Sequence, residues 1–185
     1  MKRPLEMAHD FLAQVITKDD VVLDATMGNG HDTLFLAKLA KQVYAFDIQE
    51  QALEKTSQRL QEAGLTNVEL LLQGHENVDQ FATEVKAAIF NLGYLPTADK
   101  SIITKPHTTI EALEKLCQML VKGGRIAIMI YYGHEGGDIE RDAVMDYVSQ
   151  LPQQEYTATI YRTLNQINNP PFLVMIEKLE RYRHG

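Results

Sequence analysis

The stretch Asp24-Ala25-Thr26-Met27-Gly28-Asn29-Gly30-His31-Asp32-Thr33 decides the fold that this sequence predicts. It follows the short apolar run Val21–Ala25 and opens a helical pattern over His31–Ala40. Two glycines one residue apart permit a tight turn and let a ligand approach the backbone closely. A strand, a glycine turn and a helix in this order are typical of an open α/β sheet with a ligand at the turn. A plain glycine turn with a helix cap is the alternative interpretation.

Two hydrophobic periods alternate along the rest of the chain. Short apolar runs typical of buried strands are Val21–Ala25, Val43–Asp47, Val68–Leu72, Ala87–Asn91, Arg125–Ile130, Thr157–Tyr161 and Phe172–Glu177. Helical patterns are Pro4–Ile16, His31–Ala40, Gln49–Ala63, Asn77–Phe81, Thr108–Val121 and Ile139–Leu151. Strands separated by helices predict a mostly parallel sheet with helices on both faces.

The last two predicted strands break this alternation. Only Arg162–Pro171 separates them, which is too short for a crossover helix, so we expect an antiparallel hairpin. A seven-stranded, mostly parallel α/β sheet whose last strand is antiparallel is the layout of the Rossmann-like class I methyltransferases. We therefore predict one domain over residues 1–185, in which a helix within residues 1–18 packs on the core.

Composition limits the class of protein. The chain has 185 residues, of which 45% are hydrophobic and 23% are charged, and this suits one globular domain. The longest apolar run, Ile126–Tyr132, is too short to cross a bilayer, and Met1–Lys18 lacks the apolar core of a signal peptide. The one cysteine, Cys117, fits a reducing compartment. We expect a cytoplasmic protein without membrane contact.

The charge balance bears on nucleic-acid partners. The formal net charge is −7, from 18 basic and 25 acidic residues, and it opposes non-specific binding to duplex nucleic acid. It leaves room for a local basic patch that holds one structured RNA. Basic residues gather over Lys100–His107 and near the C-terminus, although most clusters of this kind are solvated surface.

The carboxylate of Asp24 stands four residues before Gly28. A carboxylate there would repel a pyrophosphate, whereas it would attract the ammonium of a methionine moiety. Thr33 also stands where a dinucleotide fingerprint has its third glycine. Both observations favour S-adenosylmethionine over NAD as the cofactor. The remaining candidates in this turn for cofactor contacts or helix caps are Thr26, Asn29, Gly30 and Asp32.

Two further strand ends complete the predicted cofactor pocket. Asp47 ends the second strand, and its carboxylate can accept hydrogen bonds from both ribose hydroxyls. Ile48 and Gln49 follow it on the same rim. After the third strand, His75 is the candidate contact for adenine, although capping of the next helix explains that segment nearly as well.

The fourth strand ends in Asn91-Leu92-Gly93-Tyr94-Leu95-Pro96. An asparagine and an aromatic residue three positions apart have the spacing of the Asn-Pro-Pro-Tyr signature of amino-group methyltransferases. The Asn91 carbonyl can accept a hydrogen bond from a target amine, and the Tyr94 ring can stack on a base. Asn91 and Tyr94 are therefore candidate catalytic residues, and Leu92 and Gly93 are candidate substrate contacts. Asn91 also borders the cofactor pocket. A turn that merely redirects the chain is the alternative.

Two later segments are expected on the same rim. Tyr132 suits a base-stacking wall, and His134 can accept a proton, although a loop histidine is more often simply exposed. Asn168 and Asn169 can contact the substrate or merely belong to a proline-stiffened hairpin. The literal Asn-Pro-Pro-Phe of residues 169–172 is not the transfer motif, because it lies in that hairpin. The histidines and the cysteine show no metal-ligand spacing, so we expect no metal.

Together these motifs resemble the bacterial rRNA methylase family, whose members methylate the aminomethyl group of 5-aminomethyl-2-thiouridine at the tRNA wobble position. The resemblance covers nearly the whole chain and is most specific in Asn91–Pro96 and Pro170–Lys178. It implies a cofactor in the Asp24–Asp47 pocket, and a homodimer. It also implies that the anticodon arm of a tRNA lies over Asn91, Tyr94 and Tyr132.

Three other functions stay open on the sequence. A different acceptor, such as an rRNA base, a protein side chain or a small amine, would use the same pocket. An NAD-dependent oxidoreductase is opposed by Asp24 and by the missing third glycine. A non-catalytic nucleoside-binding or RNA-binding module is opposed by the intact pair of Asn91 and Tyr94.

Overall fold

The computed structural model describes residues 1–93 and 105–180. Its helices are α1 (Pro4–Ala13), α2 (His31–Leu39), α3 (Glu50–Glu62), the 3₁₀ helix η1 (His75–Gln80), α4 (Pro106–Met119) and α5 (Gly137–Ser149). Its strands are β1 (Val21–Asp24), β2 (Gln42–Asp47), β3 (Val68–Leu72), β4 (Val85–Leu92), β5 (Leu120–Ile130), β6 (Tyr156–Tyr161) and β7 (Phe172–Lys178).

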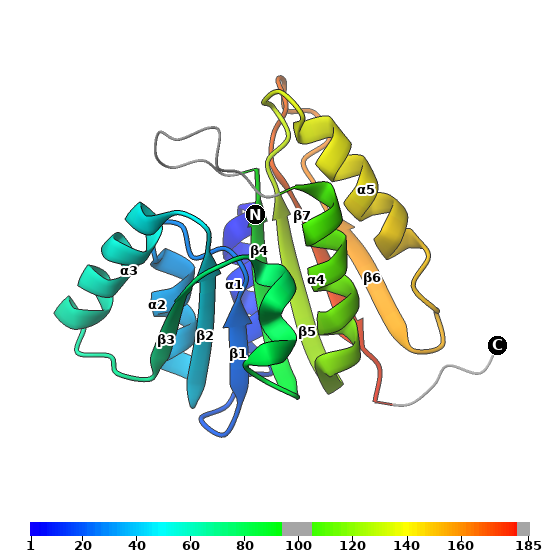
Figure 1. Ribbon diagram of the computed structural model, residues 1–185. Coiled ribbons are helices and arrows are strands. Elements are labelled where there is room, and N and C mark those ends of the chain that lie inside the picture. The colour runs from blue at the N-terminus through cyan, green and yellow to red at the C-terminus, as the bar shows by residue number, and fades with distance from the viewer. Residues whose placement is uncertain (94–104, 181–185) are drawn as a thin grey trace.

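The seven strands form one sheet in the order β3-β2-β1-β4-β5-β7-β6 (Figure 1). Strands β1 to β5 pair in parallel, and β7 runs antiparallel to both of its neighbours, β5 and β6. The predicted Rossmann-like sheet with an antiparallel last strand is therefore confirmed. The strand order reverses between β1 and β4, and ligands of such sheets bind beyond the carboxyl ends of the strands at this point.

Helices cover both faces of the sheet (Figure 1). On one face, Leu12 of α1, Leu36 of α2 and Leu60 of α3 belong to one buried cluster with residues of the strands. On the other face, Leu113 of α4 and Val144 of α5 belong to a second cluster. Because the central strands are buried on both sides, their sequences are nearly continuous apolar runs.

The first helix positions part of the functional region. Pro4 occupies its first turn, where a missing N–H costs little. Ala8 and Leu12 are fully buried, and the helix lies against β5 and β7. Residues 1–9 are thereby brought beside the carboxyl end of β5. Among the described residues, no helix is both long and apolar enough to cross a bilayer.

Several boundaries differ from the predicted ones. The helical pattern at Asn77–Phe81 is the 3₁₀ helix η1, since so few residues complete little more than one α-turn. Helix α4 ends at Met119, and β5 begins at Leu120 rather than at Arg125. Leu120 is buried and pairs with Val85, after which the register shifts. Gly123 and Gly124 in this irregular part interrupt the apolar run, so the sequence pattern does not show where the strand begins.

Candidate functional site

The turn after β1 is tied together by a buried carboxylate. Asp24 is fully buried, and it accepts hydrogen bonds from the Thr33 hydroxyl at 2.6 Å and from the Thr26 backbone N–H at 3.2 Å. Gly30 has a φ of 88°, in the left-handed region, and a Cβ there would lie 2.9 Å from the Cα of Thr56 in α3. Glycine is therefore required at this position by both the backbone and the packing.

Three carboxylates gather around this turn. Burial raises the pKa of Asp24 well above its ordinary value, and the nearby charge of Asp32 raises it further. Burial also raises the pKa of Asp47 at the end of β2, although its oxygens accept from the backbone N–H groups of Gly28 at 3.1 Å and Gln49 at 2.9 Å. A cationic ligand group would relieve the repulsion and the desolvation of such a cluster.

Asn91 lies at the end of β4, beside this turn. Its backbone N–H donates to the Thr26 hydroxyl at 2.7 Å, and its side-chain Nδ2 donates to Oδ2 of Asp32 at 2.5 Å. The other oxygen of Asp32, Oδ1, lies 2.6 Å from Nε2 of His9 in α1. The structure thus brings the predicted transfer residue and the predicted cofactor turn together, and it adds His9, which the sequence did not indicate.

His75 lies deeper than its predicted place on the rim, with 2% of its surface exposed. Its Nδ1–H donates to the carbonyl of Ala25 at 3.2 Å, and its ring packs against Phe90 at 5.4 Å between centroids. Burial lowers the pKa of His75 and so favours the neutral ring, in which Nε2 is an acceptor when Nδ1 donates. Among the described residues, this Nε2 has no hydrogen-bond partner. Contact with adenine stays a prediction for His75.

The other predicted cofactor residues also lie at this end of the sheet. The Asn29 carbonyl accepts a hydrogen bond from Nε of Arg59 in α3 at 2.6 Å, which anchors the turn from outside. Gln49 is the residue before the first turn of α3, and Ile48 is half-buried beside it. The predicted cofactor residues therefore come from the ends of β1 and β2 and the starts of α2 and α3.

The loop after β5 packs against the end of β4. The Tyr131 backbone N–H donates to the Leu92 carbonyl at 2.8 Å. Gly93 has a φ of 79°, and a Cβ there would lie 2.0 Å from the Tyr131 carbonyl oxygen and 2.5 Å from Cε1 of His134. His134 therefore lies against the predicted transfer segment. Tyr94 lies outside the described residues.

The connection between β6 and β7 reaches the same loop. Tyr132 packs edge-on against Phe172 of β7, with ring centroids 5.7 Å apart. A Cβ on Gly133 would lie 3.4 Å from the Cβ of Asn169, so the two loops are in contact distance. Asn168 has a positive φ of 61°, a conformation that asparagine tolerates better than most residues. The predicted substrate-side residues of these loops thus share one rim.

The family model described as "Putative rRNA methylase" matches residues 43–177. The chain belongs to the rRNA methylase family.

Individual relatives agree with this membership. A protein of Streptococcus mutans whose crystal structure holds SAH is 57% identical, with a TM-score of 0.92 over 97% of this chain and 99% of that one. An rRNA methylase of Streptococcus thermophilus is also 57% identical, with a TM-score of 0.86 over the same shares. The chloroplastic tRNA (mnm5s2U34)-methyltransferase of Arabidopsis thaliana is 37% identical over 96% of this chain and 70% of its own length.

These findings confirm two predictions from the sequence. This rRNA methylase family member is a class I methyltransferase of the RNA type, and its cofactor is S-adenosylmethionine. The rival hypotheses of an NAD-dependent oxidoreductase and of a non-catalytic binding module are thereby set aside. Among the described residues, no three histidine, cysteine, aspartate or glutamate side chains gather as metal ligands would.

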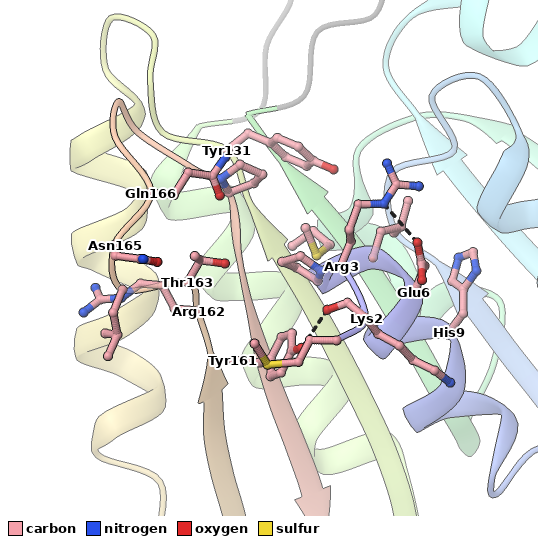
Figure 2. Close-up of a pocket in the computed structure, with 16 residues that line it drawn as sticks. Lys2, Arg3, Glu6, His9, Tyr131, Tyr161, Arg162, Thr163, Asn165 and Gln166 are labelled. Atoms are coloured by element: carbon pink, nitrogen blue, oxygen red, sulfur yellow. Dashed lines mark hydrogen bonds and ion pairs between the residues drawn. The ribbon is translucent and has the colours of Figure 1, made fainter.

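This rRNA methylase has a cavity that the sequence did not predict, at the carboxyl end of β5 (Figure 2). It has a volume of about 850 Å³ and lies between the N-terminal segment, the end of β5 and the β6–β7 connection. The Tyr161 hydroxyl donates to the Lys2 carbonyl at 2.6 Å and closes one side. Charged and aromatic side chains of its wall include Lys2, Arg3, Glu6, His9, Tyr131 and Arg162.

Proposed function

We propose that this chain methylates the aminomethyl nitrogen of 5-aminomethyl-2-thiouridine at the wobble position of tRNA. The observation that carries the proposal is the place of Asn91, which bonds to the cofactor turn through Thr26 and Asp32. Asp32 in turn contacts His9, which belongs to the cavity wall. Similarity to a plant methyltransferase named for this wobble nucleotide supports tRNA as the substrate.

In this proposal the three carboxylates of the turn serve the cofactor. Asp24 and Asp32 attract the ammonium of the methionine moiety, and Asp47 accepts from the ribose hydroxyls. The remaining residues proposed to surround the cofactor are Thr26, Gly28, Asn29, Gly30, Thr33, Ile48, Gln49, His75 and Asn91. S-adenosylmethionine supplies a methyl group on a sulfonium, which is already an excellent leaving group. The task of the protein is therefore to position the acceptor.

Asn91 is proposed to do this positioning. Its side-chain oxygen accepts a hydrogen bond from the acceptor amine and thereby aims the nitrogen lone pair. The aminomethyl group is an alkylamine, so it must lose a proton before it can react. His134 lies against Gly93 and stays a candidate acceptor for that proton. Tyr94 and Tyr132 are proposed to stack on the acceptor base, with Leu92, Gly93, Asn168 and Asn169 as further contacts.

In this proposal, basic side chains in the cavity wall bind RNA locally, although the net charge of the chain is −7. The wall has three basic side chains, Lys2, Arg3 and Arg162, and one carboxylate, Glu6. Basic side chains contact phosphates, and tyrosine rings such as that of Tyr131 can stack on bases. An acidic protein can thus hold one RNA segment at a basic wall without binding nucleic acid at large.

Methylation assays on separated acceptors test the proposed function. The purified protein, supplied with cofactor labelled on the methyl group, is incubated with tRNA from cells that lack the gene, with rRNA and with total protein. We expect label in tRNA alone, and mass spectrometry of its nucleosides should show the methylated aminomethyl uridine. Label confined to rRNA would establish the rRNA alternative and overturn the tRNA proposal. An unchanged tRNA nucleoside profile in a gene deletion would also overturn it.

We further infer that the protein is a homodimer in the cytoplasm, because the family resemblance implies a dimer and the composition fits a reducing compartment. Light scattering of the purified protein should give twice the mass of the 21.0 kDa chain. A monomer at micromolar concentration would contradict the dimer. Fractionation of cells should recover the protein with the cytoplasmic contents rather than with membranes.

A further inference from the structure

A chain of three polar side chains links α1 to the end of β4. His9 Nε2 is 2.6 Å from Oδ1 of Asp32, and Asn91 Nδ2 is 2.5 Å from Oδ2 of Asp32. Asp32 is only 7% exposed, so each oxygen of a nearly buried carboxylate faces a donor from another element of the fold. Buried charges need such partners, since an unpaired one costs several kcal/mol.

This arrangement determines which way the Asn91 amide points. A carboxylate only accepts hydrogen bonds, so the group of Asn91 that faces Asp32 is the NH₂ group. The amide oxygen is then turned away from Asp32. A flipped amide would set its oxygen against a carboxylate oxygen, and the backbone bond from Asn91 to Thr26 holds the residue in place. The amide is thus fixed with its acceptor available for an amine.

His9 is itself held in one orientation. Its ring stacks on that of Phe35 in α2, with centroids 4.0 Å apart and planes inclined by 7°. Because the group it faces is a carboxylate, Nε2 of His9 is the donor. The side chain is 25% exposed and belongs to the wall of the cavity, where Figure 2 shows it beside Glu6 and Arg3. Helix α1 therefore does more than pack on the sheet.

We propose that His9 and Asp32 are positioning residues for methyl transfer, which fix the Asn91 amide with its oxygen toward the acceptor amine. The proposal rests on the function proposed above, because it concerns the same transfer site. Without the His9 donor, one oxygen of Asp32 loses its partner and the carboxylate can rotate. The Asn91 amide then samples other orientations. Misplacement of a positioning group by about 1 Å can cost on the order of 100-fold in rate.

Two substitutions at one position separate the hydrogen bond from packing. His9→Phe keeps a ring to stack on Phe35 but removes the donor, whereas His9→Gln keeps an N–H donor at a similar distance from the backbone. For His9→Phe we expect kcat on tRNA to fall about tenfold, with KM for tRNA and Kd for the cofactor within about twofold. His9→Gln should retain most of the activity. Equal loss in both variants, or a change in KM alone, would overturn the proposal.

A spectroscopic measurement tests the same contact without any acceptor. The side-chain amide signals of Asn91 are identified in the ¹H–¹⁵N spectrum of the whole protein by their loss in Asn91→Asp. They should shift in His9→Phe and stay close to the wild-type position in His9→Gln. An Asn91 signal that ignores His9→Phe would overturn the proposal.

The two measurements also separate this inference from the proposed function. If the wild-type protein does not methylate tRNA but the Asn91 signal responds to His9→Phe, the substrate assignment is wrong and the positioning contact stands. If tRNA is methylated and neither kcat nor the amide signal responds, the function stands and the positioning role is wrong.

Discussion

The proposed cofactor end and the proposed substrate end of this site are built differently. The cofactor end consists largely of consecutive residues, since Asp24 and Thr33 bond to each other within one turn, and Asp47 comes from the neighbouring strand. The proposed substrate cavity is assembled from residues 1–6 and His9, the end of β5 and the β6–β7 connection, which lie far apart in the sequence. One end is thus a local motif and the other a product of tertiary structure. If the ends are independent, a substitution should change the affinity for one ligand and leave the other unaffected.

The largest effect is expected for Asp24→Ala. Removing a buried carboxylate leaves the cofactor ammonium without its partner, and losses of about 2–5 kcal/mol are typical for such desolvated pairs. Cofactor affinity should therefore fall on the order of 1,000-fold, as measured by isothermal titration calorimetry. Asp19→Ala, an exposed aspartate before β1, is the matched control and should bind normally. Unchanged affinity in Asp24→Ala would remove the electrostatic basis of the cofactor end.

A smaller and different effect is expected for Asn91→Ala. The variant should bind the cofactor within about twofold of wild type, because the backbone bond from Asn91 to Thr26 does not depend on the side chain. Its kcat should fall about 100-fold, since the acceptor amine loses its positioning partner. Titration and single-turnover methylation separate the two quantities. Loss of cofactor affinity equal to that of Asp24→Ala would show that Asn91 belongs to the cofactor end.

The proposed cofactor end could be suggested from the sequence because its chemistry follows strand ends directly. Asp24 and Asp47 each end a recognisable apolar run, and the parallel topology brings such ends to one rim. Asn91 was proposed in the same way. The fold followed from the alternation of strands and helices and from the short connection before β7.

The substrate end could not be predicted in this way. His9 belongs to an amphipathic helix and Arg3 directly precedes it, and nothing in the helical pattern distinguishes a helix that only packs from one that also lines a cavity. Arg162 lies in a connection without periodicity. Their meeting depends on α1 lying on β5 and β7, a contact between segments more than a hundred residues apart. The burial of His75 against Phe90 likewise does not follow from its position after a strand.

Binding of tRNA at the proposed substrate end should depend on the basic side chains of the cavity wall. In the double variant Arg3→Ala with Arg162→Ala, KM for tRNA should rise about tenfold, while kcat and cofactor affinity change little. The dependence of KM on salt should also become shallower, because fewer phosphate contacts release fewer counterions. Lys41→Ala, an exposed basic residue at the opposite end of the sheet, is the matched control. An unchanged KM would exclude the cavity as the RNA site.

The smallest effect is a pH dependence that has opposite signs in the free and cofactor-bound protein. The pKa of Asp24 is raised above its ordinary value of 3.8 by burial first and then by Asp32 and Asp47. The folded protein therefore holds this proton more tightly than the unfolded chain does. As pH falls through the raised pKa toward 3.8, protonation of Asp24 stabilises the free protein. The same proton competes with the cofactor ammonium, so cofactor affinity should fall over that range.

Other groups also titrate, and a matched variant isolates the contribution of Asp24. The pKa of Asp47 is raised and acts in the same direction, whereas that of His75 is lowered, so its protonation destabilises the fold as pH falls. The difference in melting temperature between wild type and Asp24→Asn, measured with and without cofactor at each pH, removes these shared contributions. In the free proteins, the melting temperature of the wild type should rise relative to that of the variant as pH falls. With cofactor bound, the melting temperature of the wild type should fall relative to that of the variant over the same range, because protonated Asp24 no longer attracts the ammonium. Parallel pH profiles for the two proteins in both states would mean that the Asp24 carboxylate is not the group that the cofactor ammonium meets.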